Sequence, residues 1–444
     1  MSSRFVAVLA TVGTLTTFGA SSVYAMTLQE AVSLAISTNP EVGAVANDRL
    51  AVDEELRQGE ALFYPQVDLR AETGPEFSEN DTTDSQGHDD GKWRHRSQAS
   101  LTLSQLLFDG FFAQSEVERQ QARVKSAAYR VGETAEFVGL DAVEAYLEVL
   151  RHRERVQIAE DNVATHRGTL GKVQQRADAG GGNIADVRQA EARLSAAESA
   201  LVETRGDLRD AEALFERVIG QKPDTLEAPT LPAAALPDDV DEAVATSIEN
   251  SPTVQFARAD VESAQADVKQ QEASLYPDLR LEVGGSVADN LDGKTETEHD
   301  ASALLVLRWN LYRGGADTAR IREFKHRLAE ATDLLRVNER NVAEDARVSW
   351  NAIDVSRQNV QILSQNVEAN LRTRDVYGQQ FDIGQRGLLD LLDANNELFL
   401  SRDNLITARY AEIFATYRLL ATMGALVETV GAPAPEAAIV AAEN

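Results

Sequence analysis

Apolar and polar residues alternate in four short stretches of this chain, and such a period of two predicts strands with two different faces. Two of the stretches lie at 67–72 and 99–104, and the other two lie at 279–283 and 302–309. Polar sequence rich in turn formers separates the members of each pair. The pattern therefore predicts two β-hairpins with strands of about 9–12 residues, the length that a tilted strand needs to cross a bilayer.

The two faces of the predicted hairpins differ in chemistry. We place the hairpins at about 66–108 and about 278–312, with exposed loops at 74–96 and about 286–299. One face is apolar and suits lipid, whereas the other is charged and suits water. The apolar face carries Leu101, Leu103, Leu305, Leu307 and Trp309, and the charged face carries Asp68, Arg70, Glu72, Arg280 and Glu282.

A long helix is predicted after each hairpin, at about 113–177 and about 317–381. In the first of them apolar residues, many of them small, recur every seven positions, which is typical of a coiled-coil seam. Glycines end both helices, and shorter helices return at 185–219 and 388–423. A further helix at 40–63 and the return helix at 185–219 together match the long helix in length, so we expect them to stack end to end along it.

The chain contains an internal duplication. Residues 28–69 and 240–281 align without a gap, and the Tyr-Pro pair at 64–65 recurs at 276–277. Units of this size, with both helix and strand patterns, are architectural repeats and not short solenoid modules. The predicted fold class is α+β, mainly α, built from duplicated long helical hairpins with four strands per chain.

The repeats define the domain organisation. Residues 1–25 have the order of charged, apolar and small residues that is typical of a secretory signal peptide. The first repeat occupies 26–222 and the second occupies 240–426, and a Pro/Ala-rich linker at 223–239 joins them. We expect 427–444 to be a disordered tail.

Composition narrows the possible functions. The chain has 43 basic and 72 acidic residues, a net charge of −29, and no cysteine. The acidic balance argues against a nucleic-acid partner and suits a surface or lumen that attracts cations. Gly180–Gly182 lacks the lysine of a phosphate-binding loop, and no Ser, His and Asp grouping suggests catalysis. We therefore predict no enzyme and no cofactor.

Membrane strands would force this chain to associate with copies of itself. No run of about 20 apolar residues follows the signal peptide, so a membrane span would have to use strands. Strand edges cannot remain unpaired in lipid, and membrane barrels have at least eight strands, so three chains with four strands each would give twelve. A soluble helix-and-sheet core could use the same residues. Aromatic residues that could form an interfacial girdle lie at the junctions of strands and helices: Tyr64, Phe108, Tyr276, Trp309 and Tyr312.

Several motifs resemble the TolC family of outer membrane channel-tunnels, also called outer membrane factors. They are LFDG at 107–110, LYRGG at 311–315, FDIGQRGLLDLLDANNELFLSRDNL at 381–405 and RYAEIFATYRLLATMGAL at 409–426. The resemblance implies a homotrimer with a twelve-stranded barrel in the outer membrane and an α-helical tunnel through the periplasm. It also implies an inner-membrane transporter and a periplasmic adaptor as partners. Exported proteins or small toxic molecules would be in transit, and the ending is more similar to type I secretion members than to drug-efflux members.

The resemblance also implies a gate at the periplasmic end. The family's paired gate aspartates match Asp390 and Asp393, the preceding arginine matches Arg386, and the aspartate of the first copy matches Asp186. Phe381 stands where the family usually has a tyrosine, so the hydroxyl of the family's latch is missing. In a trimer, six carboxylates would surround one axis and attract cations. Apart from the resemblance, acidic residues in the first turn of a helix are also explained by its dipole.

Two further interpretations remain at the level of sequence. His88, beside Asp89 and Asp90, could bind a metal weakly, whereas His152 and His166 are too far apart to share one and are expected to pack between helices. The chain could also be a soluble periplasmic adaptor or scaffold, made of helical hairpins with a small sheet. An adaptor would stay in solution after cell breakage, whereas a channel would need detergent.

Overall fold

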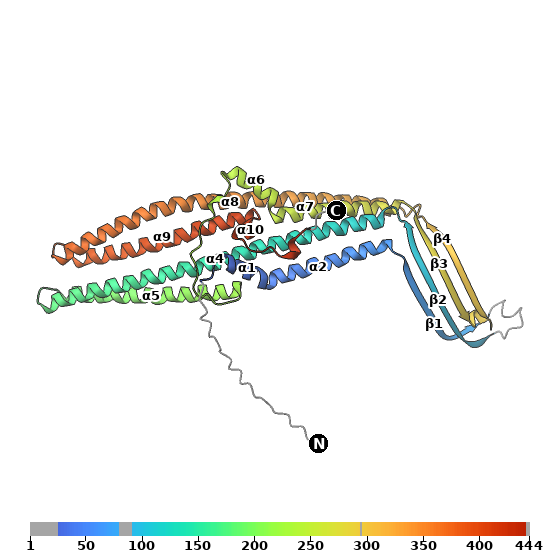
Figure 1. The fold of residues 1–444 in the computed structure, drawn as a ribbon, viewed down its shortest axis with the longest axis horizontal. Coiled ribbons are helices and arrows are strands. Elements are labelled where there is room, and N and C mark those ends of the chain that lie inside the picture. The colour runs from blue at the N-terminus through green and yellow to red at the C-terminus, as the bar shows by residue number, and fades with distance from the viewer. Residues whose placement is uncertain (1–24, 80–90, 294, 441–444) are drawn as a thin grey trace, which may run out of the picture.

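The structure is a computed structural model that describes residues 25–79, 91–293 and 295–440. Figure 1 shows an elongated molecule with the strands at one end and the helices along the rest of its length. The first 24 residues of the predicted signal peptide and the loop with His88 lie outside the described residues. Within the described ranges, no helix is both long enough and apolar enough to cross a membrane.

Four antiparallel strands form one sheet in the order β1-β2-β3-β4. Their bounds are Gln66–Ser78, Lys92–Phe108, Asp278–Asp289 and Thr297–Arg308. The predicted loops at 74–96 and 286–299 were wrong at their ends, because the strands continue into both. Pro75, for example, lies opposite His95 in the ladder. Polar composition suggested loops there, but cross-strand pairing decides where a strand ends.

The strand register confirms the two-faced pattern. Leu69 lies opposite Leu101, and Leu281 lies opposite Leu305, so these leucines share one face of the sheet. Leu69 is 75% exposed and Leu305 is 64% exposed in the single chain. The other face carries the charged residues, among which Glu282 pairs with Arg308 at 3.5 Å. The sheet therefore presents one apolar and one charged surface.

The helices follow the duplication. In the first repeat they are α1 Leu28–Thr38, α2 Pro40–Glu60, α4 Phe112–Asp178 and α5 Ile184–Ile219. In the second repeat they are α6 Val240–Asn250, α7 Pro252–Glu272, α8 Ala316–Asp382 and α9 Leu388–Thr422, followed by α10 Leu426–Val430. The long helices α4 and α8 have 67 residues each, which corresponds to about 100 Å.

The strands and the helices α2, α4, α5, α7, α8 and α9 form one layer with two free edges, bent where the helices meet the sheet, and α1, α6 and α10 pack on it (Figure 1). Along the half distant from the sheet the order is α5, α4, α9, α8, and along the half near the sheet it is α2, α4, α7, α8. The prediction that α2 and α5 stack along α4 is confirmed by their contacts with it. The strand order continues the same layer, so α8 and β4 lie at one edge, and α2, α5 and β1 lie at the other.

Tight turns connect the strands to the helices. Gly110 of the LFDG motif has φ +69°, which favours glycine. A Cβ there would lie 2.6 Å from the Cβ atom of Tyr276 and 2.7 Å from the carbonyl oxygen of Ala273. The turn from β2 into α4 therefore packs directly on the turn from α7 into β3, and only glycine fits.

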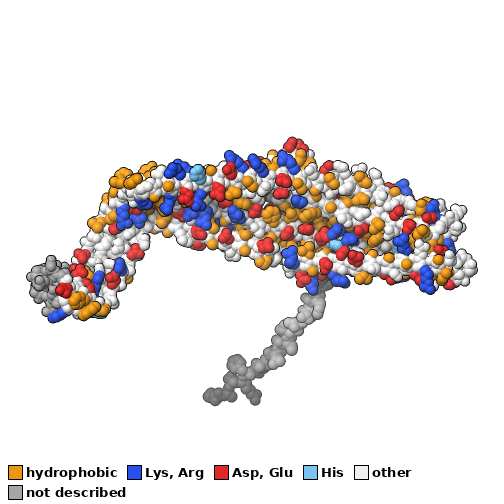
Figure 2. Space-filling view, turned by 180° about the vertical axis from the view of Figure 1, so that it is seen from behind, with side chains coloured by type: hydrophobic (Ala, Val, Ile, Leu, Met, Phe, Trp, Pro, Cys, Tyr) orange, Lys and Arg blue, Asp and Glu red, His pale blue; other side chains and the backbone are white. Residues whose placement is uncertain are grey.

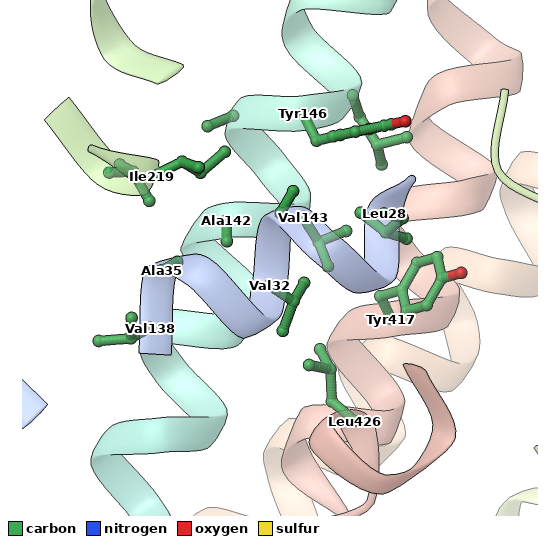
Figure 3. Close-up of a cluster of buried hydrophobic side chains, with 14 of the residues drawn as sticks. Leu28, Val32, Ala35, Val138, Ala142, Val143, Tyr146, Ile219, Tyr417 and Leu426 are labelled. Carbon is green, nitrogen blue, oxygen red and sulfur yellow. The ribbon is translucent and has the colours of Figure 1, made fainter. Parts of the chain in front are cut away.

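The largest buried cluster lies at the middle of the molecule, where α1 crosses α4 (Figure 3). Tyr146 of α4 is fully buried, and its hydroxyl group lies 2.7 Å from the carbonyl oxygen of Met26 and 2.6 Å from that of Glu227. The backbone at Met26 also pairs with Leu226. The linker between the repeats is thus held against the first repeat at this point.

The predicted disordered tail was wrong over its described part. Residues Leu426–Val430 form α10, and the side chains of Leu426 and Val427 are buried. The Gln29 side chain donates a hydrogen bond of 2.6 Å to the carbonyl oxygen of Gly431. These residues are ordered because their apolar side chains enter the cluster around α1 and α4, which local composition cannot reveal.

Candidate functional site

The candidate gate residues lie at the tips of two helical hairpins. The first hairpin joins α4 to α5, and the second joins α8 to α9. Gly180 and Gly384 adopt left-handed φ angles of +77° and +76° and end the long helices. The Asn183 side chain accepts a hydrogen bond of 2.9 Å from the N–H of Ala185 and caps α5.

A buried apolar cluster, here called the tip cluster, holds the two hairpins together. It contains residues of both hairpins, so neither tip can bury its apolar side chains alone. Its buried members are Val173, Val187 and Ala190 of the first hairpin and Phe381, Leu388, Leu391 and Leu392 of the second.

Phe381 lies in the tip cluster and not on a polar surface. Its side chain is 5% exposed. The guanidinium of Arg176 lies 4.3 Å from the centre of the phenyl ring. Arg176 Nη2 also donates hydrogen bonds of 2.9 Å to the carbonyl oxygens of Phe381 and Asp382. A side chain from the end of α4 therefore caps the end of α8.

The structure brings Arg386 and Asp390 together. Arg386 Nη1 lies 3.3 Å from Asp390 Oδ2. Arg386 Nε donates a hydrogen bond of 2.9 Å to Gln380 Oε1, and its guanidinium lies 3.9 Å from the centre of the Tyr377 ring. All these partners belong to the second hairpin, so Arg386 organises one tip internally.

The two remaining aspartates have different surroundings. Asp393 is exposed on α9, and its Oδ1 lies 3.0 Å from Arg193 Nη2 of α5. Asp186 lies in the first turn of α5 and is half-buried. Among the described residues, no ion pair joins Asp186 to Arg386 of the other tip. Of the four predicted charged gate residues, only Arg386 and Asp390 form an ion pair with each other in the described part of the single chain.

Sequence reasoning missed three cations of the first hairpin, namely Lys172, Arg176 and Arg193. Lys172 Nζ lies 2.9 Å and 3.0 Å from the two carboxylate oxygens of Asp382. The available signal was a charge asymmetry between the two copies. Lys172 and Arg176 near the end of α4 correspond to the uncharged Val376 and Gln380 near the end of α8, whereas both helices end in an aspartate, Asp178 and Asp382.

The aromatic residues predicted at the junctions lie where the sheet meets the helices. Four of them are strongly exposed, Tyr64, Tyr276, Trp309 and Tyr312, and Phe108 is half-buried. The Trp309 indole N–H donates a hydrogen bond of 3.2 Å to the carbonyl oxygen of Leu275. Figure 2 shows hydrophobic side chains gathered at this bend of the molecule, with lysine and arginine side chains beside them.

The histidines of the long helix are packed, as expected. His152 and His166 are buried, and His152 Nε2 lies 3.3 Å from Glu148 Oε2. Burial, together with the nearby charge of Arg193, lowers the pKa of His166, which favours its neutral form. Across the described ranges, no group of three or more His, Asp or Glu side chains is arranged to hold a metal ion.

Comparisons with known proteins agree on one family. The model of the outer membrane efflux protein family matches residues 31–221 and 243–425. The outer membrane efflux protein BepC of Brucella suis biovar 1 (strain 1330) is 28% identical over 75% of this chain and 73% of its own length. The alkaline protease secretion protein AprF of Pseudomonas aeruginosa is 22% identical over 91% of this chain and 86% of its own. The solved outer membrane protein VceC of Vibrio cholerae has a TM-score of 0.76 at 15% identity, covering 90% of this chain and 96% of that chain.

Proposed function

Because this chain belongs to the outer membrane efflux protein family, as its motifs predicted, we propose that three copies form the exit duct of a protein secretion system. The family consists of outer membrane channels, which extend into the periplasm. The family match sets aside the soluble adaptor alternative. The main support for the trimer is that the layer of each chain has two free edges.

The exposed face of α8 is the main support for a partner at its edge. In α8, large apolar residues recur at intervals of seven or fourteen positions on the side that points away from α9. Within one chain these large side chains lie in water, which is costly for a row of this length. The row, here called the α8 ridge, contains Leu334, Val348, Val355, Ile362 and Val376, each between 45% and 62% exposed.

The opposite edge carries a complementary surface. The side of α5 that points away from α4 has small residues at the same seven-residue spacing, here called the α5 groove: Ala192, Ser199, Gly206 and Ala213. Small residues allow helices to approach closely, and large residues of a neighbour fill the holes between them. The α8 ridge of one copy is therefore expected to pack into the α5 groove of the next.

The strand edges support the same closure. In one chain β1 and β4 are the edge strands of the sheet. Pairing β4 of each copy with β1 of the next would satisfy both edges, and three copies with four strands each would close twelve strands. The apolar face of the sheet would then face lipid, and the junction aromatics would lie at the membrane surface.

The substrate is proposed from the relatives. AprF is a protease secretion protein by name and aligns along most of this chain, which supports type I protein secretion. BepC, an efflux protein by name, supports small-molecule efflux as the second candidate. A channel of this family does not supply energy itself, so we propose an inner-membrane transporter and a periplasmic adaptor as partners.

We propose that the tips form the gate, with Asp390 and Asp393 of three copies around one axis. In planar bilayers, the purified protein should give small, cation-selective currents. Changing both aspartates to alanine should raise the conductance and weaken the selectivity for cations, because six carboxylates leave the narrowest point.

The control for this experiment is the pair Asp333→Ala and Asp354→Ala, which removes exposed acids of α8 far from the tip. This variant should keep the conductance of the unmodified protein. An unchanged conductance of the Asp390→Ala, Asp393→Ala variant would contradict the gate. A protein that forms no channel at all would contradict the duct.

A further inference from the structure

In the polar contacts that join the two tips, the first hairpin provides the cations and the second hairpin provides the acceptors. Lys172, Arg176 and Arg193 of the first hairpin all reach acceptors on the second hairpin. We call these three side chains the cationic bridge. Arg386, by contrast, bonds within its own hairpin. The second hairpin could therefore move with its Arg386 contacts intact, but it could not move away without breaking the cationic bridge.

Arg176 makes the strongest contribution to this bridge. Its two hydrogen bonds go to carbonyl oxygens in the last turn of α8, where carbonyl groups have no partner within the regular helix; that of Phe381 also accepts from the N–H of Gly384 at 3.1 Å. The negative end of the helix dipole at the same place attracts the cation. The guanidinium also covers the Phe381 ring at 4.3 Å. One side chain thus satisfies the end of α8 in three ways.

The other two members depend more on salt. In the Lys172–Asp382 pair the side chains are 56% and 48% exposed, and in the Arg193–Asp393 pair they are 41% and 52% exposed. Ion pairs this open to solvent are weak and are screened by salt. Arg176 bonds to backbone groups beside the buried tip cluster, so its contribution should persist in concentrated salt.

The next ion pair between the hairpins is distant from the tips. Arg155 Nε lies 2.7 Å from Asp403 Oδ1, and both side chains are about a quarter exposed. From Arg155 to Arg176 along α4 is about 30 Å. A movement of the tips can therefore leave this upper pair in place, so that it acts as a fixed point for the hairpins below it.

We propose that the cationic bridge, with Arg176 as its main member, is the latch that holds the second hairpin in the closed position of the gate. The inference rests on the proposed gate function. It assigns to Arg176 and the Phe381 ring the role that the tyrosine hydroxyl has in the resembled family. Arg176 is a positioning residue, because it holds α8 and α9 in position and does not contact a substrate.

The test is the conductance of the full-length protein with Arg176→Leu in planar bilayers. Leucine keeps an apolar side chain beside Phe381 but loses the charge and both hydrogen bonds. We expect the open population to rise on the order of tenfold. Arg176→Lys keeps the charge with a different donor geometry, so its conductance should lie between those of the unmodified protein and Arg176→Leu. The matched control is Arg188→Leu, because Arg188 is 73% exposed and pairs with Glu191 of its own helix at 2.9 Å.

Salt separates the members of the bridge. The double variant Lys172→Gln, Arg193→Gln should raise the conductance at ~0.1 M salt and lose this effect at ~1 M, where the Debye length falls from about 10 Å to about 3 Å. The effect of Arg176→Leu should remain at both concentrations. A thermal melt of each trimer verifies that the variants are folded.

The outcomes distinguish the latch from the gate itself. If Arg176→Leu and Arg188→Leu both conduct like the unmodified protein, while the Asp390→Ala, Asp393→Ala variant conducts more, the gate stands and the latch is wrong. If Arg176→Leu unfolds at a lower temperature than the unmodified protein, the Arg176→Lys variant provides the test. A conductance of folded Arg176→Lys above that of the unmodified protein supports the latch, and an equal conductance overturns it. Absence of current from every variant would overturn the proposed function.

Discussion

Ile362→Asp should abolish the detergent-stable trimer. Ile362 is 62% exposed in the single chain and lies in the α8 ridge, which we place against the α5 groove of the next copy. Each of the three contacts would lose about 1.5–3 kcal/mol of apolar burial. Each would also enclose an unpaired carboxylate, at a cost of several kcal/mol. Size-exclusion chromatography with light scattering in detergent should show monomers.

The α5 side of the same contact provides an independent variant. At Gly206 a Cβ would meet nothing of its own chain closer than Arg209 Nη2 at 4.0 Å. Gly206→Leu should therefore leave the monomer fold intact and still disrupt the trimer. The control is Gln361→Asp, an exposed residue a quarter turn around α8 from the ridge. Trimers that survive both Ile362→Asp and Gly206→Leu would show that α8 and α5 do not meet between copies.

The helices could be predicted closely from the sequence. Residues 317–381 were expected to form a helix, and α8 spans Ala316–Asp382. Such agreement is possible because a heptad pattern records directly which side of a helix is covered. The faces of the strands followed in the same way from a period of two. The duplication then extended each pattern from one copy to the other.

Features that depend on distant partners could not be predicted. The strands extend into sequence rich in turn formers because each residue finds a partner across the ladder. Leu426 and Val427 are held against α4 about 290 residues away in the chain, where Glu136 accepts hydrogen bonds from their N–H groups. The cationic bridge likewise joins Arg176 to Phe381, and no local pattern in the sequence predicts such a contact. The family motif identified Asp390 and Arg386 but carried no information about Arg176.

Glu136→Gln should remove a large part of the pH dependence of stability. The Glu136 carboxylate on α4 is 6% exposed and accepts hydrogen bonds from the N–H groups of Leu426 at 3.0 Å and Val427 at 3.3 Å. Burial raises its pKa from 4.5 to about 7, and the charge of Glu428 adds to this, although the two N–H groups act in the opposite direction. In the folded protein the group therefore resists ionisation.

The sign of the effect follows from the raised pKa. The unfolded chain releases the Glu136 proton near pH 4.5, whereas the folded chain holds it until about pH 7. The stabilisation is complete below pH 4.5 and is lost as the pH rises through 7, in total about 3 kcal/mol per chain. The neutral glutamine has no such loss. Melting temperatures measured from pH 5 to pH 8 should show the variant gaining on the unmodified protein up to about pH 7 and keeping a constant advantage above it.

Glu428→Gln is the matched control for this titration. Glu428 is exposed on α10 and contributes the smaller, electrostatic part of the shift, so its removal should leave most of the pH dependence in place. Other carboxyl groups, such as that of Glu148, whose pKa is lowered by hydrogen bonds to His152 and Arg151 despite burial, titrate alike in both proteins. The quantity to compare is therefore the difference between variant and unmodified protein. A difference that stays constant from pH 5 to pH 8 would mean that Glu136 is already ionised in the fold, held by the two N–H groups of α10.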